Sequence, residues 1–303
     1  MSIALLFPGQ GSQHDGFLNA LPDHVAVRET IAEASTLLGL GALTLDTEAA
    51  LESTVTTQLA LVIAGAAFAR FCAAEQIKPA AVAGISVGSY SAAIAAESID
   101  LPTALTLVRR RAELMESTFP AGSHGMAVVD GLRLTTLRSL LQETPLPIAN
   151  YNSESQHVVA GDLKVLQHFL QRATEAGAHT AKLLRMSVAS HTSELLAVAH
   201  QLSDLARRMP VHPPRIPLYS NRDARPLLTA EAVRDELVFN MAYPVRWHDI
   251  VTALGGIGTT LFLEAPPGHT LTHLAAHILP EVPSLAAEKT RWDVILRSAR
   301  RSL

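Results

Sequence analysis

The chain has 303 residues, of which 48% are hydrophobic and 17% charged, and its formal net charge is −4 at pH 7. This composition predicts a globular protein with a large buried core and excludes a disordered chain. Runs of basic residues are no longer than the three at 109–111, with pairs at 207–208 and 300–301, so the sequence lacks the positive face that nucleic-acid binding requires.

A single cysteine, Cys72, excludes an intrachain disulfide and a metal site made of several cysteines. No pair of histidines at helical spacing accompanies a carboxylate pattern, so we predict no metal. The N-terminal sequence MSIALLFPGQ has no charged segment ahead of its short apolar run, as a signal peptide would have. Uninterrupted apolar runs also stay shorter than about 18 residues, so we expect a cytoplasmic protein without a membrane span.

Short apolar runs alternate with longer segments of helical pattern along the chain. Such runs suit strands buried on both faces, as in a parallel sheet covered by helices. The expected strands are 3–7, 80–86, 216–220 and 260–265, and the expected helices are 57–75, 89–97, 102–118, 192–209, 230–242, 247–254 and 270–279. This alternation predicts an α/β fold.

The middle third of the chain has a different order of elements. The expected strands are 125–131, 148–153, 156–162 and 179–186, and the expected helices are 135–143 and 163–177. The order β-α-β-β-α-β is that of a small ferredoxin-like unit. We place this subdomain at 124–188, inserted between the two parts of a larger domain, 1–123 and 189–303. Because binding clefts favour domain interfaces, we expect the active cleft near the two junctions.

The first expected strand runs into the loop FPGQGSQ, residues 7–13. Glycine-rich loops at strand ends let the backbone approach a ligand closely. The loop lacks the Gly-Lys-Ser/Thr ending of a phosphate-binding loop. Two interpretations remain: the Gln10 N–H is a donor to an oxyanion, or the loop is a plain turn.

The second expected strand leads into Gly84-Ile85-Ser86-Val87-Gly88, which has the spacing of a nucleophile elbow. Flanking glycines allow the sharp turn that lifts a serine hydroxyl out of a sheet. The free N–H groups at the start of the next helix, including that of Val87, would then face an oxyanion. A glycine-rich turn with an ordinary capping serine is the alternative, and the strand-turn-helix context favours the nucleophile.

Arg111 lies on the apolar face of the expected helix 102–118, at about 100° per residue. The apolar neighbours on this face are Ala104, Leu107, Val108, Leu114 and Met115. A guanidinium in such a place stays charged and needs an anionic partner. A carboxylate of the protein is the commoner partner, and the carboxylate of a bound acyl group is the alternative.

A serine nucleophile needs a base, and the chain offers 13 histidines. His191, in SVASHT, lies where the inserted subdomain returns to the larger domain, so it can face the cleft. His269 and His273, which follow the expected strand 260–265, are the alternatives.

The motifs FPGQGSQ, GISVGS, RAELM, NYNS, SVASH and PVRWHD follow one another over nearly the whole chain. In this order the sequence resembles the malonyl-CoA:acyl-carrier-protein transacylase family. The resemblance implies an α/β-hydrolase-like domain with a ferredoxin-like insertion. It also implies [acyl-carrier-protein] S-malonyltransferase activity, with malonyl-CoA as substrate, an acyl carrier protein as partner, and no cofactor bound by the chain itself.

The resemblance assigns roles to matching positions. Ser86 is the expected nucleophile and His191 its base, which makes a Ser-His dyad. The N–H groups of Gln10 and Val87 are the expected oxyanion hole.

Two arginines also match family positions. Arg111, in RAELM, is expected to bind the substrate carboxylate. Arg246, in PVRWHD, takes the position whose backbone carbonyl orients the histidine, so the type of side chain there is expected to matter little.

Two residues depart from the family pattern. Ile85 stands where most members have histidine, and Ser89 replaces an acidic residue that is common in the fatty-acid-synthesis branch. With GISVGSY, NMAYPVRWHD and EAPPGHTLTHLA, these departures make the chain resemble the epsilon subunit of bacterial malonate decarboxylase most. That resemblance implies malonyl transfer to the decarboxylase carrier subunit, whose thiol belongs to a dephospho-CoA-type group.

Three alternative functions stay open. The first is a malonyl-CoA:ACP transacylase of fatty acid or polyketide synthesis. The second is a serine ester or thioester hydrolase with a Ser86-Glu264-His269 triad, in the residue order of α/β-hydrolases. The third is a scaffold subunit that keeps the fold without the activity.

Overall fold

The larger sheet forms the centre of the computed structural model, which describes residues 2–186 and 188–301. Its strand order is β10-β9-β1-β2-β7-β8, and neighbouring strands are parallel except for β7 and β8. The strands are β1 (Ser2–Phe7), β2 (Ala81–Gly84), β7 (Leu218–Tyr219), β8 (Pro226–Leu227), β9 (Thr259–Glu264) and β10 (Ser284–Ala286). All four strands predicted for this sheet are present, and the predicted α/β fold is confirmed.

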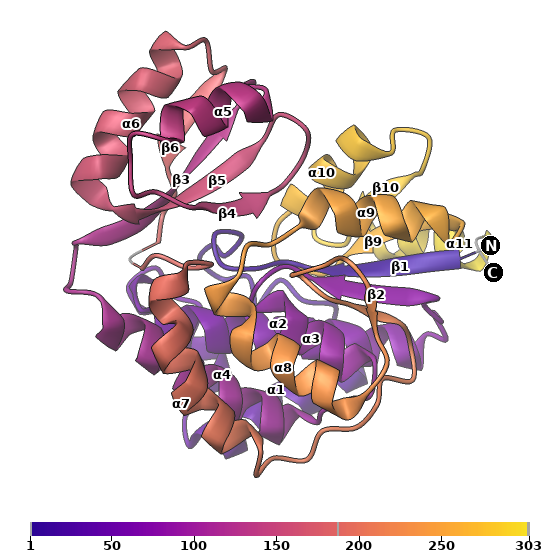
Figure 1. Ribbon diagram of the computed structural model, residues 1–303. Coiled ribbons are helices and arrows are strands. Elements are labelled where there is room, and N and C mark those ends of the chain that lie inside the picture. The colour runs from indigo at the N-terminus through magenta and orange to yellow at the C-terminus, as the bar shows by residue number, and fades with distance from the viewer. Residues whose placement is uncertain (1, 187, 302–303) are drawn as a thin grey trace.

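Helices cover both faces of this sheet (Figure 1). One face carries α1 (Val25–Leu38), α2 (Thr54–Ala74), α3 (Gly88–Ala95), α4 (Leu101–Thr118), α7 (Leu196–Ala206) and α8 (Ala230–Phe239), and the other carries α9 (Trp247–Gly256) and α10 (Thr270–Ile278). Side chains of β1 alternate between the two cores, as in any strand buried on both faces: Leu5 and Phe7 lie in one core and Leu6 in the other. The last helix, α11 (Trp292–Arg301), packs the Trp292 ring against Phe71 of α2.

The helix α2 is long and apolar enough to cross a membrane by length and composition alone. In the folded chain, 78% of its most apolar window is buried, and it contacts α1, α3 and α4. A helix that is hydrophobic on all sides is expected in the centre of a large core. The burial therefore identifies α2 as a core helix.

The smaller sheet is antiparallel, with the strand order β4-β5-β3-β6 of a ferredoxin-like unit. Its elements are β3 (His124–Asp130), α5 (Leu134–Leu141), β4 (Ile148–Tyr151), β5 (His157–Asp162), α6 (Leu163–Glu175) and β6 (Thr180–Leu183). The predicted ferredoxin-like subdomain is thus confirmed as a fold, while its boundaries at 124 and 188 stay a prediction.

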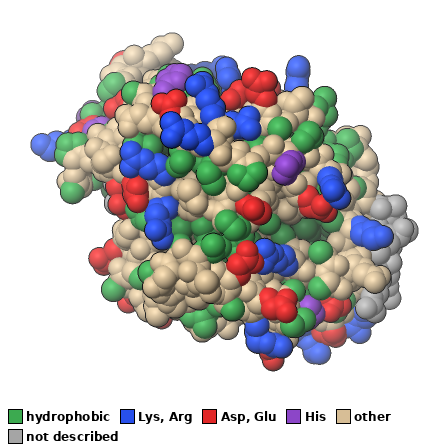
Figure 2. Space-filling model, turned by 90° about the horizontal axis from the view of Figure 1, so that it is seen from below, with side chains coloured by type: hydrophobic (Ala, Val, Ile, Leu, Met, Phe, Trp, Pro, Cys, Tyr) green, Lys and Arg blue, Asp and Glu red, His purple; other side chains and the backbone are tan. Residues whose placement is uncertain are grey.

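The smaller sheet lies beyond the carboxyl ends of β1 and β2 (Figure 1). Val245 joins it to the larger domain, since its N–H donates to Ala149 O and its carbonyl accepts from Tyr151 N, each at 2.8 Å. Short 3-10 turns complete the described chain at η1 (Ala42–Thr44), η2 (Ala50–Glu52), η3 (Ser193–Leu195) and η4 (Asn240–Ala242). On the face shown in Figure 2, acidic and basic side chains are interspersed rather than gathered by sign.

Candidate active site

Ser86 lies on the turn between β2 and α3 with a backbone φ of 55°, a conformation that residues other than glycine rarely adopt. The neighbouring glycines make this turn possible. A Cβ at Gly84 would lie 2.1 Å from the carbonyl of Gly88, and a Cβ at Gly88 would lie 2.3 Å from Phe7 O. The α3 helix can therefore begin directly against the end of β1, which gives the strand-turn-helix geometry of a nucleophile elbow.

The loop after β1 lies against this turn, because a Cβ at Gly9 would be only 2.7 Å from Ile85 O. Gln10 and Val87 both line a cavity of about 60 Å³ beside Ser86. Within the described residues, neither Gln10 N–H nor Val87 N–H has a hydrogen-bond acceptor. Two free backbone donors at the nucleophile are what an oxyanion hole requires.

Arg111 of α4 is fully buried and points at the serine. Its Nη2 donates to Ser86 Oγ at 3.1 Å and to Asn240 Oδ1 at 3.4 Å, and its Nη1 donates to Gln58 Oε1 at 2.6 Å. All three acceptors are neutral, Nε has no partner, and no described carboxylate forms a salt bridge with this side chain. Burial lowers the pKa of Arg111, yet an arginine in a protein remains a cation. The site therefore holds a buried positive charge without an anion.

His191 is buried, and its Nδ1 lies 2.8 Å from Asn240 O and 2.9 Å from Tyr243 O. Carbonyl oxygens only accept hydrogen bonds, so Nδ1 carries the ring proton and Nε2 keeps its lone pair. The backbone is fixed as well, because His191 N donates to Met241 O at 2.6 Å. These bonds present a neutral imidazole with a free basic nitrogen.

The prediction that the Arg246 carbonyl orients His191 is wrong. Arg246 precedes α9, and its carbonyl accepts from Ile250 N at 3.0 Å in the first turn of that helix. The histidine is reached instead by carbonyls earlier in the chain, at 240 and 243. The N–H of Arg246 donates to Asn221 O at 2.8 Å.

Burial, together with the nearby Arg111 charge, lowers the pKa of His191 to about 4, although the two carbonyl contacts partly oppose the shift. The imidazole is therefore neutral at pH 7 and able to accept a proton. Ser86 and His191 line the same cavity, and the serine hydroxyl accepts its hydrogen bond from Arg111. The structure thus brings together the predicted residues Ser86, His191, Arg111, Gln10 and Val87.

Sequence analysis missed Asn240, which contacts Ser86, Arg111 and His191. Its Nδ2 donates to Ser86 O at 3.1 Å, its Oδ1 accepts from Arg111, and its carbonyl accepts from His191 Nδ1. The signal in the sequence was an asparagine inside the motif NMAYPVRWHD. Gln58, on α2, was missed too and links Arg111 to the loop after β1 through Gln10 Oε1, at 3.4 Å.

A second pocket, of about 390 Å³, continues from the cavity toward the surface. The residues lining both are Gly9, Gln10, Ile85, Asn150, Val158 and Leu184. Its walls come from the loop after β1, the smaller sheet and the start of α10, with Lys182 and Thr270 among them. A long substrate can therefore reach Ser86 between the two sheets, at the domain interface where the cleft was expected.

Comparisons with known proteins agree with this geometry. The family described as acyl transferase domain matches residues 4–289. The chain belongs to this family. Among curated relatives, the malonyl CoA-acyl carrier protein transacylase of Escherichia coli K12 is 34% identical over 292 residues, covering 93% of this chain and 94% of the relative. The Bacillus subtilis protein of the same name is 29% identical, covering 94% and 92%.

Solved structures of transacylases have the same fold as this acyltransferase. The Coxiella burnetii malonyl CoA-acyl carrier protein transacylase superposes with a TM-score of 0.93 at 30% identity, covering 100% of this chain and 98% of that one. A malonyl-transacylase solved with its type II polyketide acyl-carrier protein gives 0.92 at 32% identity, covering both chains fully, 100% each. The predicted family and the predicted acyltransferase activity are confirmed. These similarities do not carry the resemblance to the malonate decarboxylase epsilon subunit.

The acyltransferase does not assemble the alternative hydrolase triad. Glu264 is fully buried and accepts from the N–H groups of Leu271, at 3.0 Å, and Thr272, at 2.6 Å, so it caps the start of α10. His269 is exposed, and its ring contacts His273. Neither Glu264 nor His269 lines the cavity at Ser86.

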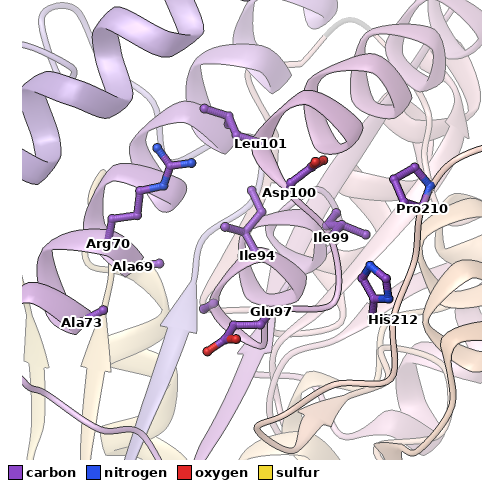
Figure 3. Close-up of a pocket in the computed structure, with 11 residues that line it drawn as sticks. Ala69, Arg70, Ala73, Ile94, Glu97, Ile99, Asp100, Leu101, Pro210 and His212 are labelled. Atoms are coloured by element: carbon purple, nitrogen blue, oxygen red, sulfur yellow. The ribbon is translucent and has the colours of Figure 1, made fainter.

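The acyltransferase has another pocket, of about 420 Å³, away from Ser86, between α2, α3, α4 and the segment 210–212 (Figure 3). Its charged residues already have structural partners. Arg70 pairs with Glu33, Glu97 pairs with Arg215, and Asp100 caps α4. The charged side chains that line this pocket are therefore engaged in structural contacts.

Proposed function

We propose that this acyltransferase is a malonyl-CoA:acyl-carrier-protein transacylase of fatty acid or polyketide synthesis. The observation that carries the proposal is the buried Arg111 cation, 3.1 Å from the Ser86 hydroxyl and without a carboxylate partner among the described residues. A malonyl thioester supplies both missing parts, an electrophilic carbonyl for the serine and a free carboxylate for the arginine. The names of the relatives support the same substrate and the same kind of acceptor.

The first half of the reaction forms a malonyl ester on the enzyme. His191 Nε2 takes the proton of Ser86 Oγ, and the oxygen attacks the thioester carbonyl of malonyl-CoA. The N–H groups of Gln10 and Val87 donate to the resulting oxyanion, which is worth about 3 kcal/mol for each such donor. The intermediate collapses by expelling CoA thiolate, which takes the proton from His191.

The second half returns the malonyl group to a thiol. The thiol of the carrier protein gives its proton to His191 Nε2 and attacks the ester carbonyl of malonyl-Ser86. Collapse of the intermediate breaks the bond to Ser86 Oγ, which regains the proton. Arg111 holds the malonyl carboxylate in both halves, and the chain supplies every group that the two steps use, so we propose that it needs no cofactor of its own.

Transfer to different carriers tests this proposal. Purified enzyme is charged with labelled malonyl-CoA and offered three purified acceptors: a fatty-acid acyl carrier protein, a polyketide acyl carrier protein, and the malonate decarboxylase carrier subunit. We expect labelled thioester on the fatty-acid or the polyketide carrier, at a rate that depends on the carrier. Transfer to the decarboxylase carrier alone, or release of free malonate in preference to transfer, would contradict the proposal.

The pH dependence of acylation follows from the low pKa of His191, about 4. The base acts when neutral, so we expect the rate of malonyl-Ser86 formation to be nearly flat from pH 8 to about 5 and to fall as the pH approaches about 4. Rapid-quench assays with pH jumps measure this limb, and recovery after return to pH 7 separates it from acid unfolding. A limb centred near 6.5, the ordinary pKa of histidine, would contradict the assignment.

A further inference from the structure

Asn221, which follows β7, forms hydrogen bonds with the backbone of the nucleophile elbow. Its Oδ1 accepts from Ser86 N at 2.7 Å, and its Nδ2 donates to Gly84 O at 2.7 Å. The orientation of the amide is fixed, because a backbone N–H can only donate and a carbonyl can only accept. One side chain thus bridges the two ends of a turn whose central residue has φ of 55°.

Asn221 is itself anchored by Glu236 of α8. Asn221 N donates to Glu236 Oε1 at 3.0 Å. Ser89 lies between the two, since its Oγ is 3.0 Å from Asn221 Nδ2 and 3.5 Å from Glu236 Oε1. Glu236 therefore accepts from the asparagine that clamps the elbow, while the single hydroxyl hydrogen of Ser89 has a nearer acceptor in Gly84 O, at 3.1 Å.

Burial of an ionised carboxyl group at position 236 is energetically unfavourable. The residue is 6% exposed, and no described Lys, Arg or His forms a salt bridge with it. Burial raises the pKa of Glu236 to about 7, although hydrogen bonds from Asn221 and Ser220 oppose the shift. An apolar side chain of similar size would fill the space at lower cost. None of the proposed steps of the reaction uses this carboxyl group.

We propose that Glu236 is a positioning residue for the nucleophile, acting through Asn221. It supplies from α8 a carboxylate acceptor for Asn221 N, and Ser89 of α3 contacts the same asparagine. Positions 89 and 236 face the same asparagine, so a carboxylate on either can hold it. The inference rests on the proposed function in taking Ser86 as the nucleophile.

Three variants of position 236 test the proposal through the pre-steady-state rate of Ser86 acylation by malonyl-CoA. Glu236→Gln keeps an oxygen acceptor for Asn221 N, and we expect a rate within about twofold of wild type. Glu236→Met keeps the volume but cannot accept, and we expect a loss of about 10- to 100-fold, as misplaced reacting groups typically cost. The KM for malonyl-CoA should stay unchanged, because Glu236 does not line the cavity at Ser86. Asp235→Ala, at an exposed position of the same helix, is the control and should behave as wild type.

Moving the carboxylate from position 236 to position 89 provides a second comparison. Glu236→Ala is expected to lose rate as Glu236→Met does, and adding Ser89→Glu to it should restore most of the loss. Equal rates in Glu236→Met and wild type, or equal losses in Glu236→Gln and Glu236→Met, would overturn the proposal. If a thermal melt shows that Glu236→Met is unfolded, the comparison passes to Glu236→Ala with and without Ser89→Glu, and equal rates in that pair would overturn it.

The same series run with p-nitrophenyl acetate separates this inference from the proposed function. Acylation of wild type by the ester but not by malonyl-CoA would refute malonyl transfer while leaving a nucleophilic Ser86. The order of rates in the position 236 variants toward the ester then decides the role of Glu236 by the same criteria.

Discussion

Replacing Ser86 by alanine is expected to abolish the covalent malonyl-enzyme and to lower malonyl transfer by about 10⁴-fold or more. The hydroxyl is the group that the structure lifts onto a strained turn beside two free N–H groups and a neutral imidazole. Ping-pong transfer stores the acyl group on this oxygen between the departure of CoA and the arrival of the carrier. Without it no intermediate can form, and the remaining groups can only bind the substrate.

Intact-protein mass spectrometry after brief exposure to malonyl-CoA measures the adduct directly, and peptide mapping locates it. Ser190→Ala removes another hydroxyl that lines the same cavity, and that variant should still show the adduct. An adduct of undiminished yield in Ser86→Ala would place the nucleophile elsewhere and contradict the proposed mechanism.

Much of the site could be predicted because its signals are local. The glycines around Ser86 are needed within one turn, where a Cβ at Gly84 or Gly88 would collide with backbone, so their spacing is visible in five consecutive letters. The buried face of α4 repeats with the period of a helix, which singled out Arg111 before any partner was known. Patterns of this length are set by backbone geometry rather than by the rest of the fold.

The residues that connect these parts could not be predicted in the same way. Asn240 is 129 positions from Arg111, and Asn221 is 135 positions from Ser86. Their contacts exist only because α8 and β7 lie beside the elbow, and an isolated asparagine has no periodic pattern. The wrong prediction for Arg246 has the same origin. Which backbone carbonyl contacts His191 Nδ1 depends on where α9 begins.

Sequence analysis did not predict two helices, α1 and α11, or the two edge strands of the larger sheet, β8 and β10. The buried face of α1 consists of Val27, Thr30 and Ala34, which is too small and too polar to give a clear apolar stripe. The strands β8 and β10 have two and three residues, shorter than the runs that indicate a strand. The last helix, α11, which follows β10, was also not predicted.

Arg111→Ala is expected to remove the preference for malonyl over acetyl groups. Malonyl transfer should fall by about 10²- to 10⁴-fold in kcat/KM, because the substrate carboxylate would enter a buried site without its cation. Acetyl transfer, which has no carboxylate to bind, should change much less. The variant also removes a positive charge that lowers the pKa of His191, so the acid limb of acylation should move to higher pH.

Competition between malonyl-CoA and acetyl-CoA for the same enzyme measures this preference and corrects for any loss of folded protein, because unfolding lowers both rates equally. Arg110→Ala is the matched control, since Arg110 lies next in the chain on the exposed side of α4 and pairs with Glu113 at 3.3 Å. That variant should keep the wild-type ratio and the wild-type pH limb. A ratio unchanged in Arg111→Ala would mean that the buried guanidinium serves Gln58 and Asn240 alone, and that selection of the acyl group takes place elsewhere in the cleft.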